Sequence, residues 1–285
     1  MKALLDLAVP SLTFLLVLAV GLDLTPGEFA RVRRQRMVLA AGLLGPLFVL
    51  PPLALLLVVL FQPSPDLQAG LLLVAACPIG GISNTYSYLA RASTALSVTL
   101  TASSSLVAVA TIPAVALVFG AALGRPVGYA VPLPFMLAQL LLMLAAPVGL
   151  GMWVRFKRPA LAARSQPYFR VLGFGGIAAL IVLIVASDPV VFVSGLSDAV
   201  PLGATFVAAS FLAGWLIGAA SGASPPDRFT LATEFATRNM AVATAIAVTL
   251  VGRVEFAVFA TTYFLTEIPL MLCAIVVYRR SRHVL

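Results

Sequence analysis

TLATEFATRNMAVATAIAV, residues Thr230–Val248, sets charged side chains inside an apolar run that is long enough to cross a lipid bilayer. Glu234 and Arg238 are four residues apart, so a helix places both on one face, and Asn239 follows directly. A charged side chain at the bilayer centre costs about 2.5–3.5 kcal/mol on insertion scales and usually marks the path of an ion or a solute. The simpler interpretation is an ion pair that neutralises itself and locks two helices together.

The composition predicts an all-α polytopic membrane protein. Of 285 residues, 61% are hydrophobic and 10% are charged, and the mean hydropathy is +1.09. A soluble domain is roughly 45–50% apolar and about 25% charged. The apolar segments are long continuous runs, which argues against a barrel of alternating strands. The net charge of +8 could suit a nucleic acid, but the arginines lie in short loops, where basic residues orient a membrane protein. We therefore expect the lipid bilayer, and no nucleic acid, as a partner.

The apolar runs predict nine spans, each of about 20 residues. Loops 25–36 and 155–170 and the C-terminal tail are rich in arginine, whereas loops 61–66 and 188–200 contain no basic residue. This asymmetry predicts a plasma (inner) membrane protein with its N-terminus outside and its C-terminus in the cytoplasm. The predicted spans are 4–24, 37–60, 67–90, 94–120, 131–154, 169–187, 201–220, 229–250 and 254–278.

The side chains that enzymes of the membrane need are scarce. The single histidine, His283, lies in the C-terminal tail, and both cysteines, Cys77 and Cys273, lie inside apolar runs. Asp188 and Asp198 fall in a predicted loop rather than at membrane depth. We therefore expect no enzymatic activity, no disulfide framework and no cofactor.

Two predicted spans contain polar or helix-breaking residues at their centres. One holds CPIGGISN, residues 77–84, and the other holds Thr237-Arg238-Asn239. Freed backbone is tolerated in a membrane only where it is buried or lines a cavity. Asn84 and Asn239 lie on spans of opposite direction, and each is followed by a proline, 29 and 30 residues later. This correspondence predicts an inverted repeat, 1–120 with four helices and 121–285 with five, and hence a secondary transporter. A packing kink is the simpler alternative at residues 77–84.

Several motifs resemble the bile acid:sodium symporter family, and the resemblance covers nearly the whole chain. The segments are GLDLTP at 21–26, CPIGGISN at 77–84, YLAR at 88–91, ALSVTLT at 95–101 and EFATRN at 234–239. The resemblance implies ten helices, of which the first is missing here, with two broken helices that cross. It also implies a panel domain, approximately 4–60 and 131–187, and a core domain, approximately 67–120 and 201–278.

The implied activity is sodium-coupled symport of a small organic anion by alternating access. Five residues match the family's first sodium site: Ser83, Asn84, Ser97, Thr101 and Glu234. Carboxylate and neutral oxygens suit a small hard cation. Ser97 and Thr101 are also four residues apart, so a helix points both hydroxyls the same way.

The family's second sodium site is altered in this chain. Arg238 and Pro46 stand where the family has glutamines, and its backbone contributions fall on Glu234, Phe235 and Thr237. Arginine is always charged and offers no acceptor, so it cannot bind a cation. We expect a single sodium ion. Arg238 then replaces the second cation by pairing with Glu234 or Glu267, or it binds an anionic solute bidentately.

The solute contacts implied by the resemblance are Gly81, Arg238, Asn239, Thr266 and Glu267. Two other functions stay open at this point. One is a sodium-independent or proton-coupled carrier of the same fold, in which Arg238 replaces the cation. The other is a membrane sensor that transports nothing. The residues predict neither the identity of the solute nor the oligomeric state.

Overall fold

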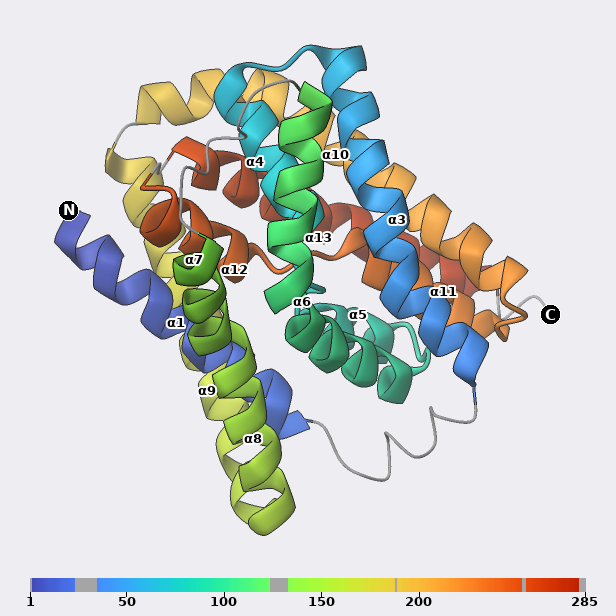
Figure 1. The fold of residues 1–285 in the computed structure, drawn as a ribbon. Helices are drawn as coiled ribbons and strands as arrows, with labels where there is room; N and C mark the ends of the chain where they lie inside the picture. Colours follow the sequence, from blue (N-terminus) through green and yellow to red (C-terminus); the bar gives the residue numbers. More distant parts are fainter. Residues whose placement is uncertain (1, 24–34, 124–132, 188, 253–254, 282–285) are drawn as a thin grey trace.

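The computed structural model describes residues 2–23, 35–123, 133–187, 189–252 and 255–281 (Figure 1). Within these ranges every element of regular secondary structure is a helix. The isolated β-bridge between Ile79 and Arg238 joins two helix breaks. The elements, in chain order, are α1 (Lys2–Asp23), α3 (Arg36–Phe61), α4 (Pro65–Ala76), α5 (Ser83–Leu89), α6 (Thr94–Leu123), α7 (Leu133–Leu140), the π-helical turn η1 (Leu141–Ala145), α8 (Ala146–Lys157), α9 (Pro159–Ser187), α10 (Pro189–Ala220), α11 (Pro225–Ala236), α12 (Met240–Ala245), the π-helical turn η2 (Ile246–Leu250) and α13 (Glu255–Ser281).

Five of the described helices are long and apolar enough to cross a membrane, as expected for a polytopic helical protein. They are Arg36–Phe61, Thr94–Ala122, Leu133–Lys157, Leu196–Ala220 and Val258–Ser281. Three shorter apolar helices cover Leu7–Asp23, Pro65–Ala76 and Met240–Leu250. The predicted third and eighth spans are both interrupted, so neither contains one helix of spanning length. The count of nine spans and the inverted repeat stay predictions.

Two helices begin earlier than the sequence analysis predicts. α9 begins at Pro159 rather than near 169, and α10 begins at Pro189 inside the predicted loop 188–200. Proline suits the first turn of a helix, where its missing N–H has no partner to lose. The first residues of α9 and α10, which include proline and polar residues, therefore belong to the helices. A criterion based on continuous apolar runs leaves such residues out.

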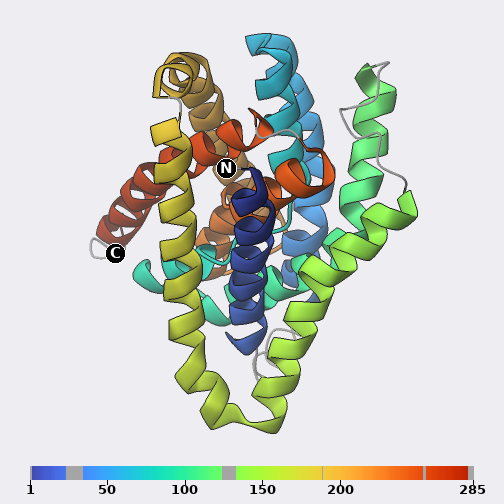
Figure 2. The same cartoon turned by 90° about the vertical axis from the view of Figure 1, so that its left-hand side faces the viewer.

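Helices from distant parts of the chain pack against one another. α1, α8 and α9 contact one another, and in Figure 2 α8 and α9 form a V with α1 between them. α10 packs against α3, α11 and α13, and α4 packs against α3 and α13. The predicted panel puts residues 37–60 with α1, but α3 packs against α4, α6, α10 and α11. The domain and repeat boundaries themselves stay predictions.

The two interrupted segments start in the same way. α4 follows Ser64, whose hydroxyl accepts from the Leu67 amide, and α11 follows Ser224, whose hydroxyl accepts from the Asp227 amide. Both helices carry proline in their first turn and aspartate shortly after it, which satisfies and complements the positive helix start. Both then end after 12 residues, at Ala76 and at Ala236.

Candidate functional site

The two helix breaks meet and complete each other's backbone hydrogen bonds. The Gly80 amide donates to the Thr237 carbonyl at 3.1 Å, and the Asn239 amide donates to the Pro78 carbonyl at 2.8 Å. We call these two breaks, residues 77–82 and 237–239, the crossing. Because buried backbone groups without partners are costly, this pairing explains how both breaks persist at the centre of an apolar fold.

Gly80 is required at the crossing by close packing. A Cβ on Gly80 would lie 2.6 Å from the Arg238 carbonyl oxygen, which is backbone and cannot rotate away. We expect Gly80→Ala to lower the free energy of unfolding by about 1–3 kcal/mol, as overpacking usually does. Thermal unfolding in detergent measures the loss. Gly149→Ala is the control, because a Cβ there has nothing within 4 Å. Equal stability of the two variants would contradict the packing at the crossing.

The carboxylate of Glu234 receives hydroxyl donors from two other elements. Ser83 at the start of α5 donates to it at 3.1 Å, and Thr101 on α6 donates at 3.3 Å. Ser97, one helical turn before Thr101, donates to the other carboxylate oxygen. Glu234 itself is fully buried near the end of α11. The crossing thus brings together groups separated by more than 130 residues.

Asn84 completes this oxygen cluster. Its side-chain oxygen lies 2.8 Å from the Ser97 hydroxyl and 3.3 Å from the Thr101 hydroxyl, so these two hydroxyls share their single protons between Asn84 and Glu234. The oxygen cluster, defined as the side chains of Ser83, Asn84, Ser97, Thr101 and Glu234, is at most 4% exposed at every member. The set has one carboxylate, one amide oxygen and three hydroxyls, which are the ligand types that a small hard cation prefers. No group of three His, Cys, Asp or Glu side chains gathers anywhere in the described part of the chain.

Arg238 is buried at the crossing with most of its donors unused. One terminal nitrogen donates to the Cys77 carbonyl, while Nε and the other terminal nitrogen have no hydrogen-bond partner. In the described part of the chain no ion pair joins Arg238 to Glu234 or to Glu267. The pairing expected from the sequence is therefore not formed here. The guanidinium keeps donors available for a further partner.

Three other residues were expected at the altered second site: Pro46, Phe235 and Thr237. Pro46 on α3 and Arg238 line the same small pocket, together with Cys77, Pro78 and Ile79. Phe235 is fully buried, and its ring packs so closely on α3 that a Cβ on Gly45 would lie 2.6 Å from it. Thr237 is also fully buried, and its carbonyl is already used by Gly80.

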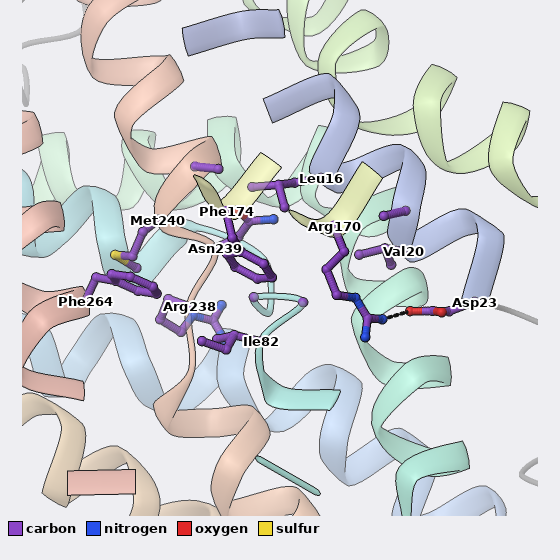
Figure 3. Close-up of a pocket in the computed structure, with 14 residues that line it drawn as sticks. Leu16, Val20, Asp23, Ile82, Arg170, Phe174, Arg238, Asn239, Met240 and Phe264 are labelled. Carbon is purple, nitrogen blue, oxygen red and sulfur yellow. Dashed lines mark hydrogen bonds and ion pairs between the residues drawn. The ribbon is translucent and has the colours of Figure 1, made fainter. Parts of the chain in front are cut away.

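A larger pocket of about 590 Å³, counted with its open mouth, lies between the crossing and the α1–α9 side (Figure 3). Three predicted solute contacts, Gly81, Arg238 and Asn239, line it. Its other walls are mainly apolar: Leu16, Ala19, Val20, Ile82, Phe174, Met240, Ala241 and Phe264. Asn239 has a structural role too, because its side-chain oxygen caps α12 by accepting from the Val242 amide at 3.2 Å.

Two predicted solute contacts are not among the residues lining this pocket. The Thr266 hydroxyl donates to the Thr262 carbonyl of its own helix at 2.7 Å, and Glu267 is fully buried. Sequence reasoning missed the ion pair between Arg170 and Asp23, which lines the pocket from α9 and α1. Asp23 stands in the GLDLTP motif, and this was the available signal. Arg170 carried no such signal, because it counts as one more basic residue of a loop.

Comparison with known proteins agrees with this architecture. The sequence model of the sodium bile acid symporter family matches residues 10–194, more than half of the chain. The chain therefore belongs to this family. The matched range includes Ser83, Asn84, Ser97 and Thr101 but ends before Glu234.

Curated relatives are named as transporters, which agrees with the expectation of a protein that is not an enzyme. The chain is 34% identical over 108 residues to "Probable sodium/metabolite cotransporter BASS2, chloroplastic" of Oryza sativa subsp. japonica, covering 38% of this chain and 26% of the relative. It is 27% identical over 168 residues to "Uncharacterized sodium-dependent transporter YocS" of Bacillus subtilis, covering 59% and 52%. The alignments thus span about a quarter to a half of the relatives' length.

Proposed function

We propose that the protein is a secondary active transporter, which couples one sodium ion to the symport of a small organic anion by alternating access. The observation that carries this proposal is the convergence of three hydroxyl side chains on the buried carboxylate of Glu234, with the side-chain oxygen of Asn84 beside two of them. The names of the relatives, which include sodium-dependent transporters, support sodium as the coupling ion. We place the protein in the plasma (inner) membrane, with the N-terminus outside.

A single sodium ion also agrees with the fixed charges at the crossing. Glu234, Arg238 and Glu267 are all at most 4% exposed, and an unbalanced charge at such a site is costly. Sodium neutralises Glu234 directly. Among the described residues Arg238 forms no ion pair with Glu234, so the arginine leaves that carboxylate available to the ion. This separation favours sodium coupling over a sodium-independent carrier in which Arg238 fills the cation's place.

The lining of the larger pocket supports a small organic anion as the solute. Arg238 is one of the residues that line the pocket and has two buried nitrogens without a hydrogen-bond partner, and arginine forks bind carboxylate or sulfonate groups through paired hydrogen bonds. The apolar walls favour a solute with a hydrophobic body. The pocket lies between α1 and α9 on one side and the crossing on the other, so relative motion of these groups would open it to either side of the membrane.

Thermal unfolding of the purified full-length protein tests this function. We expect sodium chloride to raise the unfolding temperature above that in equal potassium chloride, because an ion that binds only the folded state stabilises it. A panel of small carboxylates and sulfonates is then screened in both salts. Anion stabilisation that requires sodium supports symport. Equal stabilisation in both salts would support the sodium-independent carrier, and no response to any ion or anion would favour the sensor.

Arg170 provides a separate test of the pocket. Its pairing with Asp23 places a second guanidinium on the pocket wall, with the arginine side chain 32% exposed. We expect Arg170→Gln to weaken binding of the anion by about 5- to 10-fold, as the loss of about 1 kcal/mol from a partly exposed charged contact implies. Sodium-dependent stabilisation without the anion should not change. Loss of the sodium response in this variant would contradict the separation of the two sites.

A further inference from the structure

Glu267 is a second buried carboxylate that the sodium site does not use. It lies on α13, is fully buried, and neither of its oxygens accepts a hydrogen bond of ordinary geometry. The hydroxyls of Tyr86 on α5 and Thr237 in the crossing lie beside this carboxylate. Both hydroxyls are buried as well and have no other hydrogen-bond partner in the described chain. Three unsatisfied polar groups from three segments therefore face one another.

Several charged or titratable groups surround Glu267. Arg238 acts on it electrostatically from the crossing but forms no ion pair with it. Tyr86 faces it from α5, and Tyr263 lies on the same helix, with its hydroxyl donating to the Ala236 carbonyl. α4 and α10 also pack against α13, but none of their described charged groups acts on Glu267.

A carboxylate in this position needs a neutralising partner. An isolated buried charge costs several kcal/mol unless a counter-ion or a proton removes it. The side chains of the described residues that offer oxygens to Glu267 are two hydroxyls, whereas hard cations prefer about six oxygens. The nearby positive charge of Arg238 opposes a metal ion and a proton alike, so the small number of oxygens decides between them. A proton needs no coordination shell, and the two hydroxyls can donate to or accept from the carboxyl group.

We propose that Glu267 is a proton-binding site, separate from the oxygen cluster, and that its protonation frees Arg238 to bind the anion. This inference rests on the proposed function. With sodium at Glu234 and a proton on Glu267, Arg238 carries the one uncompensated charge of the crossing, and a monoanion neutralises it. With Glu267 ionised, the carboxylate already balances Arg238, so the anion binds more weakly. The loaded carrier then holds one sodium ion, one proton and one anion.

Infrared spectroscopy of the purified full-length protein in phosphatidylcholine nanodiscs tests the proton site without any solute. A protonated carboxyl group has a carbonyl absorption that the ionised form lacks. Spectra of the wild type and of Glu267→Gln are compared across mildly acidic to mildly alkaline pH, in sodium and in potassium. We expect a protonated-carboxyl band that titrates in the wild type and is missing in Glu267→Gln. The exposed Asp198→Asn is the control and should keep the band.

Three results would overturn the proposal. The first is a spectrum of Glu267→Gln that matches the wild type at every pH. The second is a Glu267 band that disappears when sodium replaces potassium, which would make Glu267 a sodium ligand. If Glu267→Gln does not fold, Tyr86→Phe takes its place, because removing the neighbouring hydroxyl should shift the frequency of the band. The third result that would overturn the proposal is a carboxyl band of Tyr86→Phe at the same frequency as in the wild type. A wild type without any sodium response refutes the symport proposal instead, whatever Glu267 does.

Discussion

Glu234→Gln is expected to abolish the sodium-dependent rise in unfolding temperature. Glutamine has nearly the same shape but no charge, so the oxygen cluster would lose the group that neutralises the ion. At a sodium concentration one hundred times the dissociation constant, the wild type should gain about 2.7 kcal/mol from the ion. The variant should gain close to nothing. Unfolding curves over a series of sodium concentrations, at constant total salt, measure the difference.

The loss must be separated from a general loss of stability. Three hydroxyls donate to the Glu234 carboxylate, and an amide oxygen cannot accept from all of them. Some destabilisation in potassium is therefore expected, and the difference between the two salts is the relevant quantity. Asp198→Asn changes the same charge at an exposed site and should keep the full response. A full sodium response in Glu234→Gln would show that the ion binds elsewhere.

Arg238→Gln is expected to have the largest effect on the anion. Removing one member of a buried, hydrogen-bonded charge pair usually costs 2–5 kcal/mol, which corresponds to a loss of affinity of about 30-fold to several thousand-fold. The substitution also restores the residue type that the family pattern has at its second sodium site. We therefore expect the sodium stoichiometry to rise from one ion per solute. Parallel fluxes of labelled sodium and of an anion from the thermal screen, in proteoliposomes, measure both.

Arg238→Lys distinguishes charge from shape in the same assay. Lysine keeps the positive charge but lacks the planar fork, so it should recover part of the affinity without changing the sodium stoichiometry. Arg228→Gln is the control, because that arginine donates to the Ala223 carbonyl at the start of α11, away from the crossing. If Arg238→Gln leaves both affinity and stoichiometry unchanged, the arginine is neither an anion ligand nor a cation substitute.

The sequence predicted the two breaks more reliably than the spans around them. The first break is indicated by Pro78, which removes a backbone donor, and by Gly80 and Gly81, which loosen the helix. The second break has no such residues at its centre. Its signal is the polar group Thr237-Arg238-Asn239, and the structure explains the break by the cap that Asn239 provides to α12 and by the hydrogen bonds to the first break.

The contacts that the sequence could not predict depend on long-range packing. Arg170 meets Asp23 only because α9 and α1 lie side by side, and these residues are 147 positions apart. The packing of α3 against α10 and α11 likewise follows from the shapes of apolar helix faces, which look alike in a uniformly hydrophobic chain. The sequence also could not predict the grouping of Glu267, Tyr86 and Thr237, because no motif indicates that Tyr86 on α5 lies beside Glu267 on α13.

Equilibrium binding of radioactive sodium to the purified protein tests the central claim most directly. The oxygen cluster is expected to bind one sodium ion per polypeptide in the wild type, and Glu234→Gln is expected to bind none. Saturable binding of one ion that disappears in the variant would agree with a sodium site built from Ser83, Asn84, Ser97, Thr101 and Glu234. Absence of saturable binding in the wild type, or equal binding in the variant, would contradict it.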